Sequence, residues 1–531
     1  PITKDQTSVE YYATIFTVAE SPIARGTIWT GSDDGLVYVT RDDGKTWTNV
    51  TPKGLPEWAR ISIIEASHFA PGTAYLAANR YQLDDQQPYL YRTTDYGATW
   101  TRIDAALPRE EFTRVIREDP ARRGLLFAGT ERGVWVSFDD GAPWQSLRRN
   151  LPQVPVHDLA VKDGDLVAAT HGRSFWILDD ISPLEQLGAA DAKASVHLFK
   201  PRDAYRVSWG GGFGGDRGAH PEGKNPPSGA VIYYTLAKPH QEVTLEFLDA
   251  KGSSIRKFSS LLDSAGRADS VRADSVKRAR TDSLTKAGIA ADSIKKLEKS
   301  GEETEPEGRR PPPRPPRVPD KAGLNAFVWD LRYPDASTFE DMILWAGMTR
   351  GPVAVPGTYT VRLTTNGETQ TRTFVVRKDP RVQATQRDLQ EQFALLIKLR
   401  DAVSRANDAV TNIRHVKREL VERKAKAPAS YGDEAQRLAD RLSAIEAEIY
   451  QVKNRSSPDP LNYPIRLNNK IAALAGAVAS ADARPTAQDY AVYLDLTKQL
   501  DTQLAALKSV LGSELPKVNA ALKSAGLREV R

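Results

Sequence analysis

The chain has 531 residues, of which 40% are hydrophobic and ten are tryptophan, so it is long enough to form several folded domains. Its 73 basic and 68 acidic residues leave a formal net charge of +5, an imbalance too small to indicate nucleic-acid binding. The absence of cysteine excludes disulfides, thiolate metal sites and a cysteine nucleophile, and no apolar run is long enough to predict a membrane span.

Three near-copies of one short motif lie in the first 150 residues. They begin at residues 40, 93 and 137 and follow the pattern Ser/Thr-x-Asp-x-Gly-x-Thr/Ser-Trp, except that Pro143 replaces the last hydroxyl residue of the third copy. In such a turn glycine supplies a positive φ, aspartate accepts hydrogen bonds from backbone N–H groups, and tryptophan packs between sheets. We therefore predict structural roles for Asp42, Gly44, Trp47, Asp95, Gly97, Trp100, Asp139, Gly141 and Trp144.

The same order of strands returns around each motif. A strand that ends near a proline, a second strand opened by glycine and an alternating third strand precede the motif, which leads into an outer fourth strand. A fourth cycle follows at 156–178, but Asp179-Asp180-Ile181 lacks both the glycine and the tryptophan of the motif. Residues 10–185 therefore predict about four blades of four strands each, an arrangement typical of a β-propeller.

The motifs resemble the Asp-boxes, or bacterial neuraminidase repeats, of sialidases, xyloglucanases and the sortilin propeller. Further segments are similar to the large bacterial proteins known as sortilin-like or glycosyl-hydrolase-like: 88–93, 129–137, 169–180, 225–230 and 327–333. The resemblance implies a secreted, periplasmic or cell-surface location and a propeller with more than four blades. We therefore expect a C-terminal portion of such a protein, whose earlier blades are missing or supplied by another polypeptide. A closed ring of four blades is the alternative.

The propeller region, 1–190, is followed by a second group of predicted strands in 191–260 and 323–380. Turn sequences such as Asp249-Ala250-Lys251-Gly252 connect them, and together they predict one immunoglobulin-like β-sandwich. The sandwich is interrupted by an insertion at 259–322, which is highly charged and then proline-rich. Because such a composition buries little apolar surface, we predict that the insertion is disordered.

From residue 381 to 531 the apolar period becomes helical. Leu389, Phe393, Leu396 and Leu399 begin a series of four- and three-residue steps that predicts one long helix. Further helices are predicted at 432–453, 461–481 and 486–511, with a shorter one after Gly512. The apolar seam of this bundle is expected to be its core, and an alternative role is a homo-oligomer interface.

Candidate site residues lie in the turns between the second and third strands of each blade. These turns emerge at the opposite end of the sheet from the Asp-boxes, because consecutive strands are antiparallel. They carry four carboxylate candidates, Asp34, Asp84, Asp85 and Glu131, and three candidates for ligand binding, Arg132, His171 and Arg173. A glycosidase needs two carboxyl groups about 5 to 10 Å apart. The alternative is that the acidic residues cap tight turns.

The leading hypothesis is an extracytoplasmic recognition protein that binds a peptide or glycan at the rim formed by these turns. A glycoside hydrolase that uses two rim carboxylates, such as Glu131 with Asp84, is the first alternative. A structural subunit of a surface assembly is the second. The seven histidines show no zinc-binding spacing, so neither a metal nor another cofactor is predicted.

Overall fold

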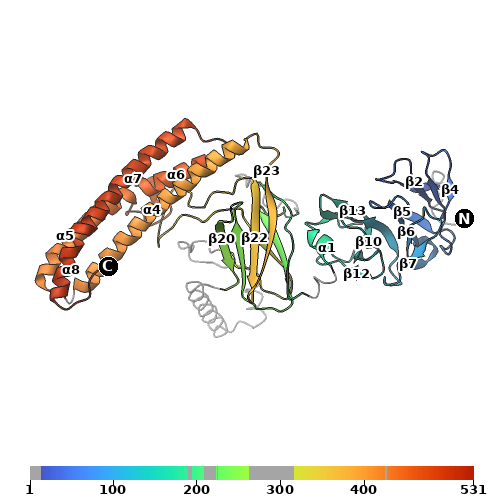
Figure 1. Ribbon diagram of the computed structural model, residues 1–531, viewed down its shortest axis with the longest axis horizontal. Helices are drawn as coiled ribbons and strands as arrows, with labels where there is room; N and C mark the ends of the chain where they lie inside the picture. The colour runs from blue at the N-terminus through green and yellow to red at the C-terminus, as the bar shows by residue number, and fades with distance from the viewer. Residues whose placement is uncertain (1–12, 189–193, 208–222, 224, 262–315, 425–426) are drawn as a thin grey trace, which may run out of the picture. The chain divides into compact units, whose positions relative to one another are not determined.

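The structure is a computed structural model that describes residues 13–188, 194–207, 223, 225–261, 316–424 and 427–531. It consists of two compact units, Pro1–Ala192 and Lys193–Arg531. In Figure 1 the first unit is coloured blue to teal and the second green to red. Each unit is described by itself.

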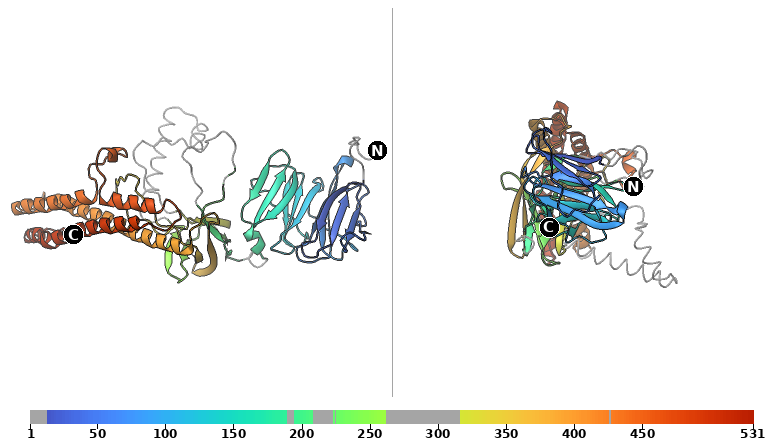
Figure 2. Two further views of the ribbon diagram at one scale, coloured as in Figure 1. Left: turned by 90° about the horizontal axis from the view of Figure 1, so that it is seen from above. Right: turned by 90° about the vertical axis from the view of Figure 1, so that its right-hand side faces the viewer.

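The first unit contains four antiparallel sheets, each built from strands that are consecutive in the chain (Figure 2). The first sheet is formed by β1 (Ile15–Glu20), β2 (Ile28–Ser32), β3 (Val37–Thr40) and β4 (Thr48–Asn49). The second is formed by β5 (Arg60–Ala66), β6 (Ala74–Arg80), β7 (Asp85–Thr93) and β8 (Thr101–Arg102), with the short helix η1 (Tyr81–Leu83) between β6 and β7. The third is formed by β9 (Thr113–Glu118), β10 (Leu126–Thr130), β11 (Gly133–Ser137) and β12 (Gln145–Ser146).

The fourth sheet has three strands where four were predicted: β13 (Val156–Lys162), β14 (Asp165–Thr170) and β15 (Phe175–Leu178). After β15 the chain forms the short helix α1 (Ser182–Gln186) instead of an Asp-box and an outer strand. The missing motif at 179–181 explains the difference, because these residues lack the glycine that the box turn requires. The prediction of four-stranded propeller blades is thus confirmed for three of the four sheets.

Small residues on the second strands let neighbouring sheets approach closely. A Cβ atom on Gly31 would lie 2.4 Å from Ile61 of the second sheet, and one on Gly129 would lie 2.9 Å from Val156 of the fourth. By contrast, no described residue covers the outward faces of the first and last sheets: Ile15 and Val18 are exposed at one end, and Phe175 and Ile177 at the other. The four sheets therefore form an open row, not the closed four-blade ring considered as an alternative.

The second unit begins with two sheets that share one hydrophobic core, centred on Phe247, Trp329, Tyr359 and Phe374. The smaller sheet has the order β16 (Val196–Leu198), β18 (Ala230–Leu236), β21 (Gly323–Trp329). The larger has the order β17 (Ala204–Arg206), β23 (Glu368–Lys378), β22 (Gly357–Thr365), β19 (Val243–Leu248), β20 (Ser254–Ser259). Because β17 pairs with β23 in parallel, the larger sheet is mixed. The predicted strands are present, but an immunoglobulin-like sandwich is not shown.

Most of the predicted insertion, residues 262–315, lies outside the described residues. Its described C-terminal flank belongs to the β core. Val318 is fully buried, and its N–H donates to the carbonyl of Ser259 at 3.1 Å. The chain therefore rejoins the core before residue 323, where the sequence analysis placed the boundary.

The C-terminal helices are confirmed as α4 (Gln386–Lys424), α5 (Ala429–Ile449), α6 (Leu467–Val478), α7 (Ala487–Ser513) and α8 (Leu515–Ser524). A short helix, η3 (Asp459–Leu461), lies between α5 and α6. Helix α6 begins six residues later than predicted, because Pro464 disfavours a helical conformation at the preceding residue. The buried Arg206 of β17 donates to Gln392 of α4 at 3.0 Å and to Asp482 at 2.7 Å, which fixes the helices to the β region.

Candidate functional site

The first two Asp-boxes share one set of hydrogen bonds. In the second, the Thr93 hydroxyl accepts the N–H of Gly97 at 2.9 Å, and the Asp95 carboxylate accepts the N–H and hydroxyl of Thr99 at 2.9 and 2.7 Å. The same donors at Thr46, with the hydroxyl of Thr40, lower the pKa of Asp42 to about 2. The aspartates of these two boxes therefore accept hydrogen bonds from within their own turns.

The third box keeps the turn but loses the bonds to its carboxylate. Ser137 still accepts the N–H of Gly141 at 3.0 Å. Pro143 has neither an N–H nor a hydroxyl, and among the described residues no donor reaches the carboxylate of Asp139.

The motif tryptophans connect neighbouring blades. The indole N–H of Trp100 donates to the carbonyl of Val50 in the preceding blade, and that of Trp144 donates to Ile103, both at 2.7 Å. Trp47, in the first blade, is 43% exposed, and its indole finds no acceptor within the described part of the chain. The tryptophan of each box therefore depends on a blade that precedes it.

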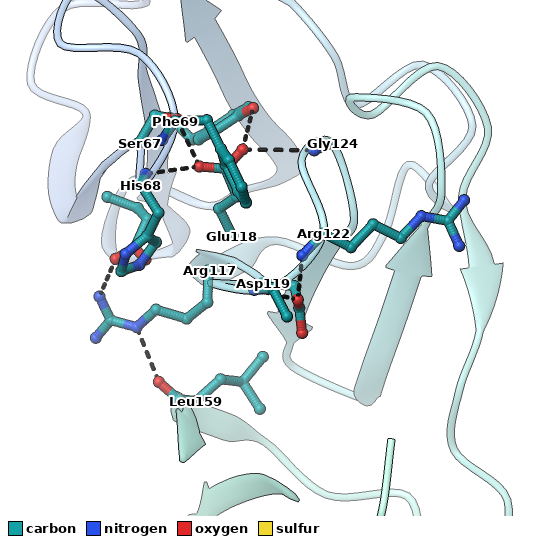
Figure 3. A network of polar contacts seen from close by, with 12 residues as sticks. Ser67, His68, Phe69, Arg117, Glu118, Asp119, Arg122, Gly124 and Leu159 are labelled. Carbon is teal, nitrogen blue, oxygen red and sulfur yellow. Dashed lines mark hydrogen bonds and ion pairs between the residues drawn. The ribbon is translucent and has the colours of Figure 1, made fainter. Parts of the chain in front are cut away.

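A buried polar network lies beside the Asp-boxes, between the second and third blades (Figure 3). Glu118 accepts the hydroxyl of Ser67 at 2.6 Å and the N–H of His68 at 3.0 Å. Tyr75 donates to Asp140, in the third box, at 2.7 Å. Burial raises the pKa of the neighbouring Asp119. Because Glu118 and Asp119 are buried and Glu118 accepts its hydrogen bonds from the chain itself, we assign the network to blade packing; the sequence analysis did not identify it.

At the opposite end, which is the rim, η1 between the second and third strands of the second blade meets the start of the first strand of the third blade. Tyr81 stacks on Phe112 with ring centres 4.8 Å apart, and the Arg114 guanidinium lies over both rings, 5.3 and 4.8 Å from their centres. Arg114 also donates to the Glu131 carboxylate, at 2.7 Å from Nη2 and 3.0 Å from Nε. Two aromatic rings, a cation and an anion therefore meet where the second and third blades adjoin.

Two exposed histidines continue this rim onto the fourth blade. His157, at the start of β13, and His171, in the β14–β15 turn, are in edge-to-face contact, with Nε2 of His157 3.3 Å from Nδ1 of His171. Burial, Arg114 and His171 lower the pKa of His157, against the opposing effect of Glu131. We call the six residues Tyr81, Phe112, Arg114, Glu131, His157 and His171 the rim cluster.

Only some of the predicted site residues come together here. Glu131 and His171 belong to the rim cluster, whereas Asp34 accepts a hydrogen bond from Ser32 and Asp84 ends helix η1 with a positive φ of 58°. Asp85 accepts bonds from Tyr89 at 2.6 Å and Arg80 at 3.0 Å. Burial opposes its ionisation, but these bonds and the N–H of Gln87 lower its pKa.

The two arginines predicted at the rim, Arg132 and Arg173, have no carboxylate partner among the described residues. Arg132 and Arg173 are exposed on the β10–β11 and β14–β15 turns, and neither forms an ion pair with any residue that the structure describes. Tyr81, Phe112, Arg114 and His157 escaped the sequence analysis, because none belongs to a repeated motif.

Searches for a metal site and a membrane helix gave negative results over the described residues. These contain no group of three His, Cys, Asp or Glu side chains able to hold a metal ion. Among the same residues, every helix is too short or too polar to span a bilayer.

No protein-family model matches the chain. Two oligoxyloglucan-reducing end-specific xyloglucanases, from Neosartorya fischeri and Emericella nidulans, are each 30% identical to it, over 132 and 113 residues. These segments are 24% and 20% of this chain, and 16% and 14% of the relatives. Vacuolar protein sorting/targeting protein 10 of Laccaria bicolor is 32% identical over 108 residues, which are 19% of this chain and 6% of that protein.

The chain thus matches far less than two thirds of each relative's length. Among solved structures, YCF48 bound to D1 peptide is 23% identical and covers 32% of this chain and 52% of its own, with a TM-score of 0.25. A score this low carries no argument about the ligand. The sequence matches confirm, over part of the chain, the predicted relationship to Asp-box β-propeller proteins of the xyloglucanase and Vps10 type.

Proposed function

We propose that the Asp-box unit is a recognition module and that its rim cluster binds a peptide or glycan bearing a carboxylate. The observation that carries the proposal is the pair of exposed arginines, Arg132 and Arg173, which flank the cluster without carboxylate partners in the described chain. A guanidinium group offers two parallel N–H donors to a carboxylate. The partly exposed ring of Tyr81, which stacks on the buried Phe112, supplies the apolar surface beside them.

The geometry supports binding more than hydrolysis. A glycosidase needs one carboxyl group held protonated as the general acid beside an ionised one. At this rim Glu131 is paired with Arg114, and the lowered pKa of Asp85 favours its charged form.

Calorimetric titration of the full chain tests the proposal. The probes are an acidic peptide, a glucuronic acid oligosaccharide and neutral xyloglucan oligosaccharides. The double variant Arg132→Ala/Arg173→Ala is expected to lower the affinity for the carboxylate ligand at least about tenfold, because it removes two charge-assisted contacts. Arg372→Ala, at a partly exposed arginine of β23, is the control. Unchanged affinity in the double variant would contradict carboxylate recognition. Turnover of xyloglucan that is abolished by Glu131→Gln would establish the hydrolase alternative instead.

We predict that carboxylate binding strengthens on acidification. Because the pKa of His157 lies below the usual histidine value, its imidazole gains a positive charge as the pH falls below that value. Affinity measured from pH 7.5 to 5 should therefore rise as the pH falls. His157→Gln/His171→Gln should flatten the profile and leave affinity at pH 7.5 nearly unchanged. A flat profile in the unmodified chain would show that the histidines do not face the ligand.

We also propose that a further blade, from the same protein or another chain, lies against the exposed face of β1. The support is the indole bond that joins the second blade to the first and the third to the second. Trp47 is the equivalent tryptophan of the first blade, and the side chains of Ile15 and Val18 on β1 are also exposed.

A further inference from the structure

The fourth blade lacks the parts that complete the other three. In those, a two-residue outer strand pairs with the third strand, as Thr48 and Asn49 of β4 do with β3. In the fourth blade no described strand pairs with the outer edge of β15. Its N–H and carbonyl groups therefore form an edge to which an extended chain can be added.

Three residues just beyond the outer strands occupy equivalent positions. The N–H of Val50 donates to Val37, that of Ile103 to Leu90 and that of Leu147 to Val134, at 2.8, 2.9 and 2.8 Å. Trp100 and Trp144, from the following blade, bond the carbonyls of the first two. The fourth blade has no box tryptophan, and no described indole bonds the carbonyl of Leu147.

A groove lies where that tryptophan would be. It has a volume of about 60 Å³, room for about four to six water molecules, which suits the inserted edge of an aromatic ring. Apolar side chains from the third and fourth blades line it: Val134, Leu147, Leu151, Leu166, Ala168 and Trp176. Arg148 and Arg149 also line it, and both are exposed and form no ion pair with the described residues.

We propose that this groove binds an extended peptide in which a tryptophan follows acidic residues. Its indole enters the groove and donates to the carbonyl of Leu147, as Trp100 and Trp144 do at Val50 and Ile103. Its backbone pairs with β15 as the missing fourth strand, and its acidic side chains meet Arg148 and Arg149. The site is separate from the rim cluster, uses none of its residues, and does not rest on the rim function.

The chain's own first Asp-box supplies the probe. A fluorescein-labelled peptide with the sequence of residues 40–51, which contains two aspartates and Trp47, is titrated with the full chain and followed by anisotropy. The matched control is the same peptide with Trp47→Ala. We expect the tryptophan peptide to bind and the alanine peptide to bind at least about tenfold more weakly, since a buried aromatic anchor dominates such contacts.

Variants of the chain locate the binding. Leu147→Glu and the double variant Arg148→Glu/Arg149→Glu should each lower the affinity for the tryptophan peptide at least about tenfold. Leu494→Glu, on the exposed face of α7, should not. Ala168→Leu fills the groove without adding charge, and should weaken binding even if Leu147→Glu fails to fold. Folding is checked by circular dichroism.

Three outcomes would overturn the proposal: no binding of the tryptophan peptide, equal affinities for the two peptides, or full affinity in both Ala168→Leu and Arg148→Glu/Arg149→Glu. The variant Arg132→Ala/Arg173→Ala separates this site from the rim. It should weaken the rim ligand and leave the tryptophan peptide unaffected, so either proposal can fail alone.

Discussion

The first and second Asp-boxes have almost the same sequence and the same internal hydrogen bonds, yet their tryptophans differ. Trp100 donates to Val50 of the blade before it, whereas Trp47 points its indole at no described acceptor. A Cβ atom on Gly97 would meet Val50 at 2.6 Å, while one on Gly44 would meet only Trp47, at 3.8 Å. The conformation of the turn therefore depends on the motif alone, whereas the contribution of the motif to stability depends on the neighbouring blade.

The largest expected difference is between the tryptophans. Trp144→Ala removes an indole that is 6% exposed and bonded to Ile103, and should destabilise the unit by about 3–5 kcal/mol. Trp47→Ala, at 43% exposure, should cost less than about 1 kcal/mol. Urea unfolding, with hydrogen exchange of residues 13–188 as the readout, measures both. Equal losses would mean that the exposed face of the first blade is covered in solution.

The glycines should show a smaller contrast. Gly97→Ala combines a positive φ of 85° with a clash against Val50, and should cost about 2–4 kcal/mol. Gly44→Ala has nearly the same φ, 83°, but free space, so only the conformational term of about 1–2 kcal/mol remains. The same unfolding measurement applies. If the two variants lose the same free energy of unfolding, packing between the blades contributes nothing to the stability of the box.

The smallest expected effect is on the melting temperature at acidic pH. The lowered pKa values of Asp42 and Asp95 mean that their contribution is present above the ordinary value of 3.8 and is lost as the pH falls through the folded values, about 2 for Asp42. Melting temperature measured from pH 5 to 2 should thus fall more steeply in the unmodified chain than in Asp42→Asn/Asp95→Asn. Asp139→Asn is the control, since its carboxylate receives no bond from the described donors. An identical slope in all three proteins would refute the assignment.

The repeated parts of the fold could be predicted from the sequence because each is specified locally. The threonine, aspartate and glycine of a box satisfy one another within five residues, as Thr40, Asp42 and Gly44 do. The spacing of apolar residues from Leu389 onward likewise predicted the long helix α4. The parallel pairing of Ala204 with Val376 has no local signal, since 172 residues separate them, and it makes the larger sheet of the β region mixed.

The rim was predicted only in outline. Strand order places the second-to-third turns at one end, and Glu131 and His171 were found there. Their partners Arg114 and His157 lie within strands. In an alternating strand, the sequence does not distinguish a polar residue that belongs to a site from one that merely faces solvent. The ion pair between Arg114 and Glu131 weakens the case for catalysis, and only the three-dimensional structure shows it.

The indole bond between blades also gives the row of sheets a polarity. The second and third blades each offer an indole donor to the blade before them, and the first and second each offer a carbonyl to the blade after them, so the two sides of a blade are not interchangeable. Growth of such an array is directional, like a filament with distinct ends. Duplication of one blade in tandem preserves every junction, whereas insertion of a blade facing the other way leaves two indoles opposed, which restricts how propellers of this kind gain and lose repeats in evolution.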